Sequence, residues 1–233
     1  MKKLHNTLAV AAMFLLIAAV LITSFQIAIY GDPSYRFYQK EYEKYQVAES
    51  LGMDMDHIMD VTEKMMDYLI GKRERLSVVT TVEGSRQDFF NEQDRLHMAD
   101  VKNLFLGGLS LRRWLLAGMV VLLGLLVLLK GDWKRILPRA YLAALAVFLA
   151  ATAVLGCLIA SDFTRYFTIF HELFFTNDLW LFDPETDYMI RMLPEGFFYD
   201  MVVRIGLIFV GSLFLLLLFF LVWRKWVKNK KSL

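Results

Sequence analysis

Four long apolar stretches constrain the fold of this chain more than any other feature of its sequence. A helix needs roughly 20 mostly apolar residues to cross a bilayer, and the second stretch reaches that length if it extends toward Asn103. Helices that are apolar on every side do not suit a small soluble domain. The chain, 57% hydrophobic, is therefore predicted to be an all-α integral membrane protein with four transmembrane helices. The four stretches run from about Leu8 to Tyr30, Trp114 to Leu129, Ala140 to Ala160 and Met201 to Trp223.

Basic residues are expected to mark the cytoplasmic side of the membrane. Loops rich in Lys and Arg tend to stay in the cytoplasm, and here three such segments alternate with the four stretches. Both termini are therefore predicted to be cytoplasmic, and the remaining loops form a mainly helical extracytoplasmic cap. Arg112 and Arg113 oppose this rule and are expected to snorkel to the outer surface. The three basic segments hold Lys2 and Lys3; Lys130, Lys134, Arg135 and Arg139; and Arg224, Lys225, Lys228, Lys230 and Lys231.

The chain divides into five predicted segments. The first stretch is interpreted as a retained signal anchor, because its apolar run is longer than that of a signal peptide and no small-residue cleavage site follows it. The segments are 1–30, the N-terminal cytoplasmic end and first transmembrane helix; 31–113, an outer segment with an amphipathic helix; 114–160, the second and third helices with a short cytoplasmic loop; 161–200, an acidic and aromatic outer loop; and 201–233, the fourth helix and basic cytoplasmic tail.

The first outer segment has its own pattern of elements. Residues 35–45 are polar and aromatic and are expected to lie along the lipid headgroups. A helix capped by Asp54 is predicted from about Met55 to Lys72, with one apolar face that lies on the bilayer or on the transmembrane bundle. Residues 76–82 alternate weakly and indicate a short strand. Residues 87–106 then predict a helix that runs into the second transmembrane stretch.

Charge and cysteine usage exclude some functions. The net charge of +2 is small, and it comes from the cytoplasmic ends, so it suits anionic lipid headgroups and not nucleic acid. The single cysteine, Cys157, permits no disulfide within the chain. It lies inside the third apolar stretch, where it is interpreted as a small packing residue.

Two histidines in the outer segments are the candidate catalytic groups. An imidazole can accept or donate a proton near neutral pH, so a convergent pair could perform acid–base chemistry. His97 has Asp100 one helical turn further on, where the two side chains can share a face. His171 is followed by Glu172 and by a run dense in acids and aromatic residues. His57 lies between acidic neighbours and is expected to be an ordinary surface residue.

Other polar residues near these histidines are supporting candidates. Arg204, just inside the fourth stretch, would be costly in lipid and is therefore a functional candidate, with snorkelling as the alternative. The acidic run also exceeds what an interfacial aromatic belt requires. Besides Asp100, Glu172 and Arg204, the supporting candidates are Arg95, Asn177 and Asp178.

The signatures of several enzyme classes are missing. The chain has no GxSxG, HExxH, Walker or GxGxxG motif, so it predicts no serine-hydrolase elbow, zincin site or nucleotide loop. Two histidines and a carboxylate could bind zinc, but spacing cannot identify ligands from separate loops, and no metal or cofactor is predicted. Because no nucleophilic side chain stands out, the nucleophile of any reaction is expected to come with the substrate.

Two strings of the sequence resemble a known family. RLHMADVKNLF at Arg95–Phe105 and FTIFHELFFTNDLWLFDPETDYMIRMLPEGFF at Phe167–Phe198, in a four-helix frame of this length, are similar to the bacterial lipoprotein intramolecular transacylases. The resemblance covers essentially the whole chain. It implies a protein of the bacterial cytoplasmic membrane whose two catalytic histidines are His97 and His171, with the active site at the outer leaflet.

The resemblance also implies a reaction. The sn-2 acyl chain of a diacylglyceryl-modified lipoprotein would move to the α-amine of its N-terminal cysteine and leave a lyso-form lipoprotein. Asp100 and Glu172 would then hold the imidazoles in the right tautomer, and Asn177 or backbone N–H groups would stabilise the oxyanion. The expected partners are diacylglyceryl lipoproteins and membrane lipid.

Two other functions fit the same residues. One is a metal-assisted membrane lipid hydrolase that uses both histidines and a carboxylate. The other is a non-enzymatic membrane anchor or assembly protein whose outer loops bind a partner. A chelator would inactivate the first, and replacing the histidines would leave the second intact.

Overall fold

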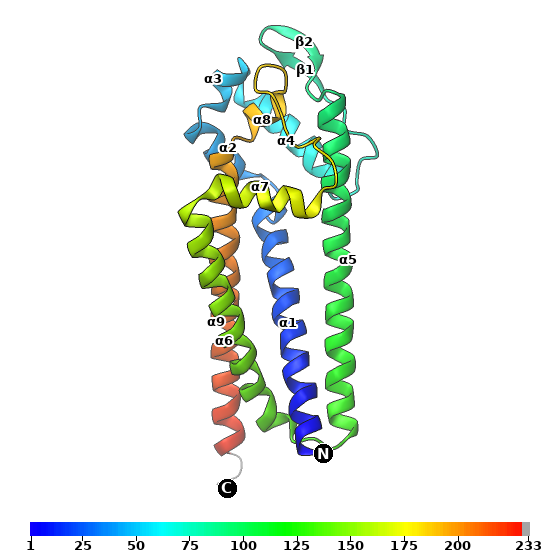
Figure 1. Ribbon diagram of the computed structural model, residues 1–233, viewed down its shortest axis with the longest axis vertical. Helices are drawn as coiled ribbons and strands as arrows, with labels where there is room; N and C mark the ends of the chain where they lie inside the picture. The colour runs from blue at the N-terminus through cyan, green and yellow to red at the C-terminus, as the bar shows by residue number, and fades with distance from the viewer. Residues whose placement is uncertain (230–233) are drawn as a thin grey trace. The chain divides into compact units, whose positions relative to one another are not determined.

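Four of the helices in the computed structural model, which describes residues 1–229, are long and apolar enough to cross a membrane (Figure 1). They are α1 (Lys2–Tyr30), α5 (Glu92–Leu128), α6 (Trp133–Ser161) and α9 (Glu195–Asn229). The predicted transmembrane fold is therefore confirmed, although every helix extends beyond its apolar stretch. Hydropathy marks only the part that suits lipid, whereas backbone hydrogen bonds continue the helix into polar sequence.

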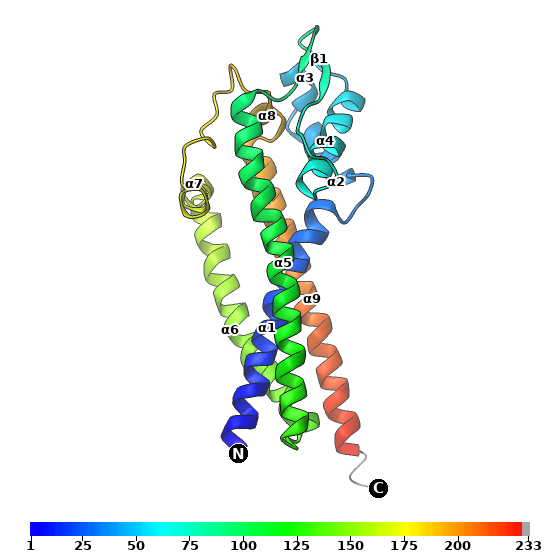
Figure 2. The ribbon, with the colours of Figure 1, turned by 90° about the vertical axis from the view of Figure 1, so that its right-hand side faces the viewer.

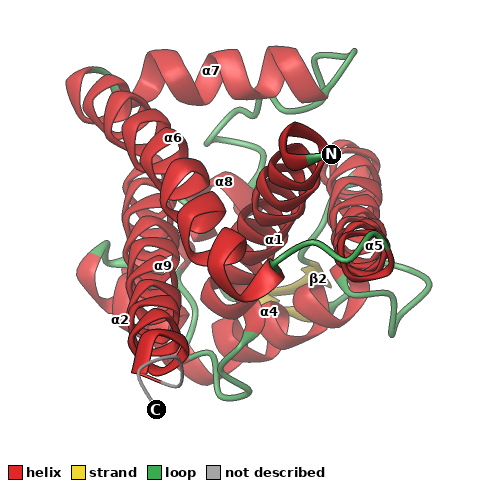
Figure 3. Ribbon diagram, turned by 90° about the horizontal axis from the view of Figure 1, so that it is seen from below, coloured by secondary structure: helices red, strands yellow, loops and turns green. Residues whose placement is uncertain are grey.

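The helices contribute to two compact units. The first, here called the bundle unit, comprises Met1–Ile27, Leu109–Ala160 and the part of α9 from Arg204. Figures 1 and 3 show α1 between α5 on one side and α6 with α9 on the other. Small residues allow this close packing, since Ala9 and Ala12 are fully buried against the other helices.

The outer surface of the bundle unit is apolar. Leu128, Leu155 and Leu207 are each more than half exposed, as expected for side chains that face acyl chains. Cys157 is exposed on α6, so it is not the small packing residue that the sequence predicted. Lys230 and Lys231 of the predicted basic tail lie outside the described residues.

The second unit, here called the hairpin unit, comprises Ala28–Gly108 and Ser161–Val203. Besides the ends of the long helices, it contains the short elements α2 (Arg36–Lys44), α3 (Val47–Leu51), α4 (Met55–Leu69), β1 (Val79–Val82), β2 (Ser85–Asp88), α7 (Phe163–Phe174) and α8 (Tyr188–Met192).

A β-hairpin precedes α5. The predicted strand is present as β1, and it pairs in antiparallel fashion with β2, from Val79 opposite Asp88 to Val82 opposite Ser85. Glu83 and Gly84 join the strands with φ values of 51° and 77°, and a two-residue hairpin turn with two positive φ values matches the twist of the strands.

The start of α5 differs from the prediction, because Gln87 belongs to β2. The helix begins at Glu92, immediately after a reciprocal cap. The Asp94 backbone N–H donates to Asn91 Oδ1 at 2.9 Å, and the Asn91 N–H donates to the Asp94 carboxylate at 3.0 Å. Such a capping box satisfies donors that the first helical turn leaves unpaired.

The amphipathic helix is α4, but its apolar face packs within the hairpin unit. Tyr42 of α2 makes a 2.8 Å hydroxyl–hydroxyl hydrogen bond with Thr62, and the Tyr38 hydroxyl donates to Met66 Sδ at 3.6 Å. Both tyrosines are buried, so residues of α2 cover α4 where the bilayer or the transmembrane bundle was expected. Asp54 occupies the N-cap position, but its side chain makes no cap hydrogen bond.

Candidate active site

His97 and His171 lie side by side in the hairpin unit. His97 belongs to the first turns of α5 and His171 to α7, and their ring centroids are 6.1 Å apart with the planes inclined by 26°. The relative exposures of His97 and His171 are only 6% and 8%. Two residues far apart in sequence thus form one stacked and buried pair.

Aromatic side chains surround the histidine pair. His97 has Phe175 and Phe182 at centroid distances of 5.1 and 5.3 Å. Trp180 lies 4.9 Å from His171. All three aromatic residues come from the segment that follows α7. Such a shell keeps water away from the imidazoles, and electrostatic interactions are stronger in a dry site.

One tautomer of His171 is favoured by its own helix. Nδ1 lies 2.7 Å from the carbonyl oxygen of Phe167, one turn earlier in α7. Because a carbonyl can only accept, Nδ1 carries the proton and Nε2 of the neutral ring keeps its lone pair. Burial lowers the pKa of His171 below its ordinary value of 6.5, so the ring is neutral, and its Nε2 basic, at neutral pH.

Glu172 does not orient His171, contrary to the prediction. Its side chain is exposed, and the Nδ1 hydrogen bond goes to the Phe167 carbonyl instead. Adjacent residues of a helix point in different directions, which accounts for the separation. Asp178 is likewise exposed.

Asp100 makes its hydrogen bond elsewhere than predicted, although its charge still acts on the His97 imidazole. Its carboxylate accepts a hydrogen bond from Asn177 Nδ2 at 2.9 Å, whereas Nδ1 of His97 is buried and has no hydrogen-bond partner among residues 1–229. A buried imidazole nitrogen without a partner is costly. It is therefore a position at which a bound molecule can form a hydrogen bond.

The segment after α7 is hydrogen-bonded to residues at the start of α5. Besides the Asp100–Asn177 bond, Gln93 Nε2 donates to the carbonyls of Leu179 and Leu181 at 3.2 and 2.9 Å, and Asn91 donates to the buried Asp187. Figures 1 and 2 show this loop beside the upper part of α5. We call residues 175–187 the strap. No sequence motif indicated these contacts, because each joins positions far apart in the chain.

Two predicted supporting residues have other surroundings. Arg95 Nε donates to the Leu76 carbonyl at 3.1 Å, its Nη2 to the Phe90 carbonyl at 2.5 Å, and the same nitrogen lies 3.1 Å from the Asp88 carboxylate. Arg95 therefore holds the hairpin region against α5. Arg204 belongs to the bundle unit.

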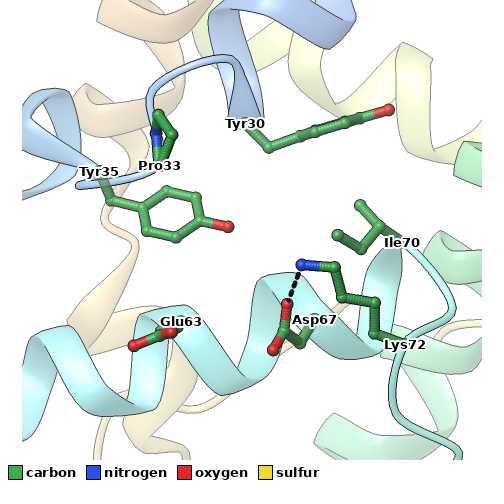
Figure 4. A pocket seen from close by; sticks show the side chains of 7 residues that line it. All are labelled: Tyr30, Pro33, Tyr35, Glu63, Asp67, Ile70 and Lys72. Carbon is green, nitrogen blue, oxygen red and sulfur yellow. Dashed lines mark hydrogen bonds and ion pairs between the residues drawn. The ribbon is translucent and has the colours of Figure 1, made fainter.

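A separate cavity of about 370 Å³ in the hairpin unit is lined by neither histidine. Figure 4 shows that side chains from the end of α1, the following loop and α4 converge on it, with Lys72 Nζ 3.0 Å from the Asp67 carboxylate. Among the described residues, no three His, Cys, Asp or Glu side chains are grouped to hold a metal ion. The cavity is lined by Tyr30, Pro33, Tyr35, Glu63, Asp67, Ile70 and Lys72.

Comparison with protein families matches residues 10–198 to the model of the lipoprotein intramolecular transacylase Lit. The chain belongs to the Lit family. This match covers both histidines, the strap, the whole of α5 and α6, and most of α1. No curated protein matches the chain.

Solved structures of a Lit protein share the fold. The membrane integral Lit of Bacillus cereus matches with a TM-score of 0.78 and 22% identity over 100% of both chains. A variant with one histidine replaced by alanine matches with a TM-score of 0.74 and 22% identity, over 100% of this chain and 97% of that one. A variant with arginine there has a TM-score of 0.72 and 22% identity over 99% and 95% of the two chains.

Membership in the Lit family makes this chain an acyltransferase, because the family is one of transacylases. Together with the four long apolar helices and the fold of a membrane integral Lit, it makes the chain an integral membrane enzyme. The predicted class of enzyme is confirmed, and the anchor or assembly protein considered above is not supported.

Proposed function

We propose that this Lit protein moves the sn-2 acyl chain of a diacylglyceryl lipoprotein to the α-amine of the lipoprotein's N-terminal cysteine. The product is an N-acylated lyso-form lipoprotein. The observation that carries the proposal is the buried pair of His97 and His171 within a family of intramolecular transacylases. Such a transfer needs proton movement and a dry site, but no nucleophile from the enzyme.

His171 is the general base in this proposal. The substrate amine has a pKa of about 8, so it must lose a proton in order to attack the ester. Nε2 of the neutral His171 ring, whose Nδ1 hydrogen is directed to Phe167, accepts that proton as the new N–C bond forms. General base catalysis requires this lone pair to face the reacting amine.

His97 protonates the departing glyceryl oxygen. As the ester C–O bond breaks, an N–H of His97 supplies a proton to that oxygen, and the imidazolium of His171 returns its proton to His97. Both rings thus end neutral, and the products are an amide and a free hydroxyl. Nδ1 of His97, which no group of the described residues 1–229 satisfies, supports a role in binding the reacting groups.

Proximity supplies the remaining assistance. Attack closes a ring through the amine, Cα, Cβ, sulfur, two glyceryl carbons, the ester oxygen and the carbonyl carbon. Holding amine and ester together can contribute up to ~7–11 kcal/mol. The aromatic residues of the strap, such as Trp180 and Phe182, exclude water that would otherwise hydrolyse the ester. Asn177 keeps one amide hydrogen beyond its bond to Asp100, which it can offer to the oxyanion.

The substrate reaches this site from the outer leaflet. The orientation rests on the basic segments at one side of the predicted topology, which places both termini in the cytoplasm and the histidine pair outside. Diacylglyceryl lipoproteins and membrane lipid are accordingly the proposed partners.

An isotope crossover experiment tests the proposal. Two lipoproteins are incubated together with the enzyme in membranes, one with labelled acyl chains and the other with a distinguishable peptide. Mass spectrometry of the N-terminal peptides should find the label only on the peptide that carried it. Label on the second peptide or on the enzyme contradicts direct intramolecular transfer, and free fatty acid as the main product indicates a hydrolase.

Two controls accompany the crossover experiment. Cys157→Ala should remain active, because this exposed thiol takes no part in the proposed reaction. Chelators should have little effect, since neither step uses a metal; inactivation by a chelator would instead favour the metal-assisted hydrolase.

A further inference from the structure

Helix α7 carries an apolar stripe on its exposed side. At about 100° per residue, Ile169, Phe170, Leu173 and Phe174 fall within one arc, and their exposures are 43%, 40%, 75% and 50%. Glu172 lies outside this arc, and His171 lies on the side that meets His97. The helix thus has an apolar outer side and a catalytic inner side.

The stripe has no protein cover among the described residues. The apolar face of α4, in the same unit, is buried from Ile58 to Leu69. The apolar face of α4 is thus covered by protein, whereas the stripe of α7 is exposed. Four large apolar side chains exposed on one short helix would be unfavourable in water.

The connection between α6 and α7 indicates what covers the stripe. Only Asp162 separates the end of α6 at Ser161 from the start of α7 at Phe163. The last turns of α6 expose Val154, Leu155 and Leu158, as expected for a transmembrane helix in contact with acyl chains. Asp162 caps α7 by accepting from the Arg165 N–H at 3.1 Å, so α7 begins where the transmembrane helix ends.

The length of the stripe indicates how α7 meets the bilayer. A helix of 12 residues is about 18 Å long, and exposed apolar residues occur to its last turn. A helix standing out from the membrane would place Leu173 and Phe174 in water. A helix along the interface buries the whole stripe in the acyl-chain boundary, as amphipathic interfacial helices do.

We propose that α7 is an interfacial helix whose stripe of Ile169, Phe170, Leu173 and Phe174 inserts among the acyl chains of the leaflet at the Ser161 end of α6. The inference extends the proposed function, and rests on it only in treating His171 as catalytic. The occupant of the stripe is lipid, recognised by its hydrocarbon chains.

This surface brings acyl chains next to the histidine pair. The Phe170 ring, part of the stripe, lies 5.5 Å from the His171 ring and 4.8 Å from that of Phe174. A diacylglyceryl group can therefore remain among lipid chains while its ester approaches His171. The substrate would not have to leave the bilayer to react.

Spin-label accessibility tests the proposal in the full chain. Cys157→Ala removes the single cysteine, and one label at a time is then attached at Leu173→Cys, Glu172→Cys or Leu155→Cys. Each protein is placed in vesicles of phosphatidylglycerol and phosphatidylethanolamine without a lipoprotein. Collision rates with oxygen, which concentrates in lipid, and with a polar nickel complex, which stays in water, are compared.

The ratio of oxygen to nickel collisions at Leu173 should shift to that of the lipid-facing label at Leu155, whereas the label at Glu172, the adjacent residue, should collide mainly with the nickel complex. A water-like ratio at Leu173 would overturn the proposal. Low collision rates with both reagents would overturn it as well, because they would indicate a protein partner. The readout involves no acyl transfer, so a failed crossover experiment leaves it unaffected.

Discussion

The two histidines are held differently, and the difference gives each a separate chemical role. His171 is oriented by a carbonyl of its own helix, whereas His97 presents a buried nitrogen that has no partner in the described part of the chain. The group that orients His171 is thus a backbone carbonyl, and no side-chain substitution can remove it. Variants of the imidazole itself are therefore the informative ones.

Replacing either histidine with Ala should abolish acyl transfer. General acid–base catalysis is typically worth ~10²–10⁴-fold, and each ring is assigned one of the two proton transfers. His57→Ala is the matched control, because His57 is exposed and lies 4.0 Å from Asp54. Mass spectrometry of a lipoprotein N-terminus measures the product. Full activity in His97→Ala would disprove the two-histidine mechanism.

Acid should destabilise the protein through His171. Its pKa is lowered in the folded state by burial, so the unfolded chain binds a proton that the folded chain does not. The free energy of unfolding therefore falls as the pH drops below about 6.5, by about 1.4 kcal/mol for each unit by which the pKa is lowered.

The loss can be measured as the drop in Tm in detergent between about pH 7.5 and about pH 5. His171→Asn should show a smaller drop than the parent protein, because asparagine does not titrate. An equal drop in both proteins would mean that the pKa of His171 is not lowered in the folded state.

At the scale of single elements, the first turn of α9 depends on one glycine. A Cβ at Gly196 would lie 2.5 Å from two ring carbons and the hydroxyl oxygen of Tyr45. The Tyr45 hydroxyl also donates to Asp200 at 2.6 Å. Gly196 therefore allows the chain after α2 to lie directly against α9.

Gly196→Ala should lower the free energy of unfolding by ~1–3 kcal/mol, since the ring must move. Gly211→Ala, in the same helix but with nothing within 4 Å of its Cβ position, should raise it by roughly 0.5–1 kcal/mol. Thermal unfolding in detergent compares the two. The same change in the free energy of unfolding in both variants would show that Tyr45 does not pack against Gly196.

The contact between α5 and the strap can be tested by a double-mutant cycle. Asp100 and Asn177 share one hydrogen bond, and a bond to a charged group is worth ~1.5–3 kcal/mol. The losses in kcat from Asp100→Ala and Asn177→Ala should therefore not add. Additive losses would instead indicate that Asp100 acts on His97 independently of Asn177.

The sequence predicted the helices better than their contacts. Hydropathy locates the four transmembrane helices because lipid selects composition, and the apolar face of α4 follows from helical spacing. Helical spacing could not identify the partner of Asp100. It suggested the nearby His97, whereas the hydrogen bond is made with Asn177, which is 77 positions away in the sequence. The hydrogen bond between Phe167 and His171 could have been predicted, because a residue four positions earlier in a helix is always a neighbour.

For the molecule as a whole, the topology prediction awaits reporters. A fusion after Leu233 or within residues 130–139 should report the cytoplasm, because basic residues gather there. Fusions near Ser85 or Pro184 should report the outside. An external C-terminus would reverse the orientation and would move the histidine pair to the inner leaflet.

Helix α5 also limits how this enzyme can be simplified. It is a single unbroken helix of 37 residues, with His97 in its first turns and the apolar transmembrane stretch at its other end. A soluble fragment that retains the histidine pair would have to end inside this helix, and inside α9 as well. Both cuts would leave carbonyls without their partners four residues on, so a detergent-free minimal enzyme would require a designed replacement for the severed turns.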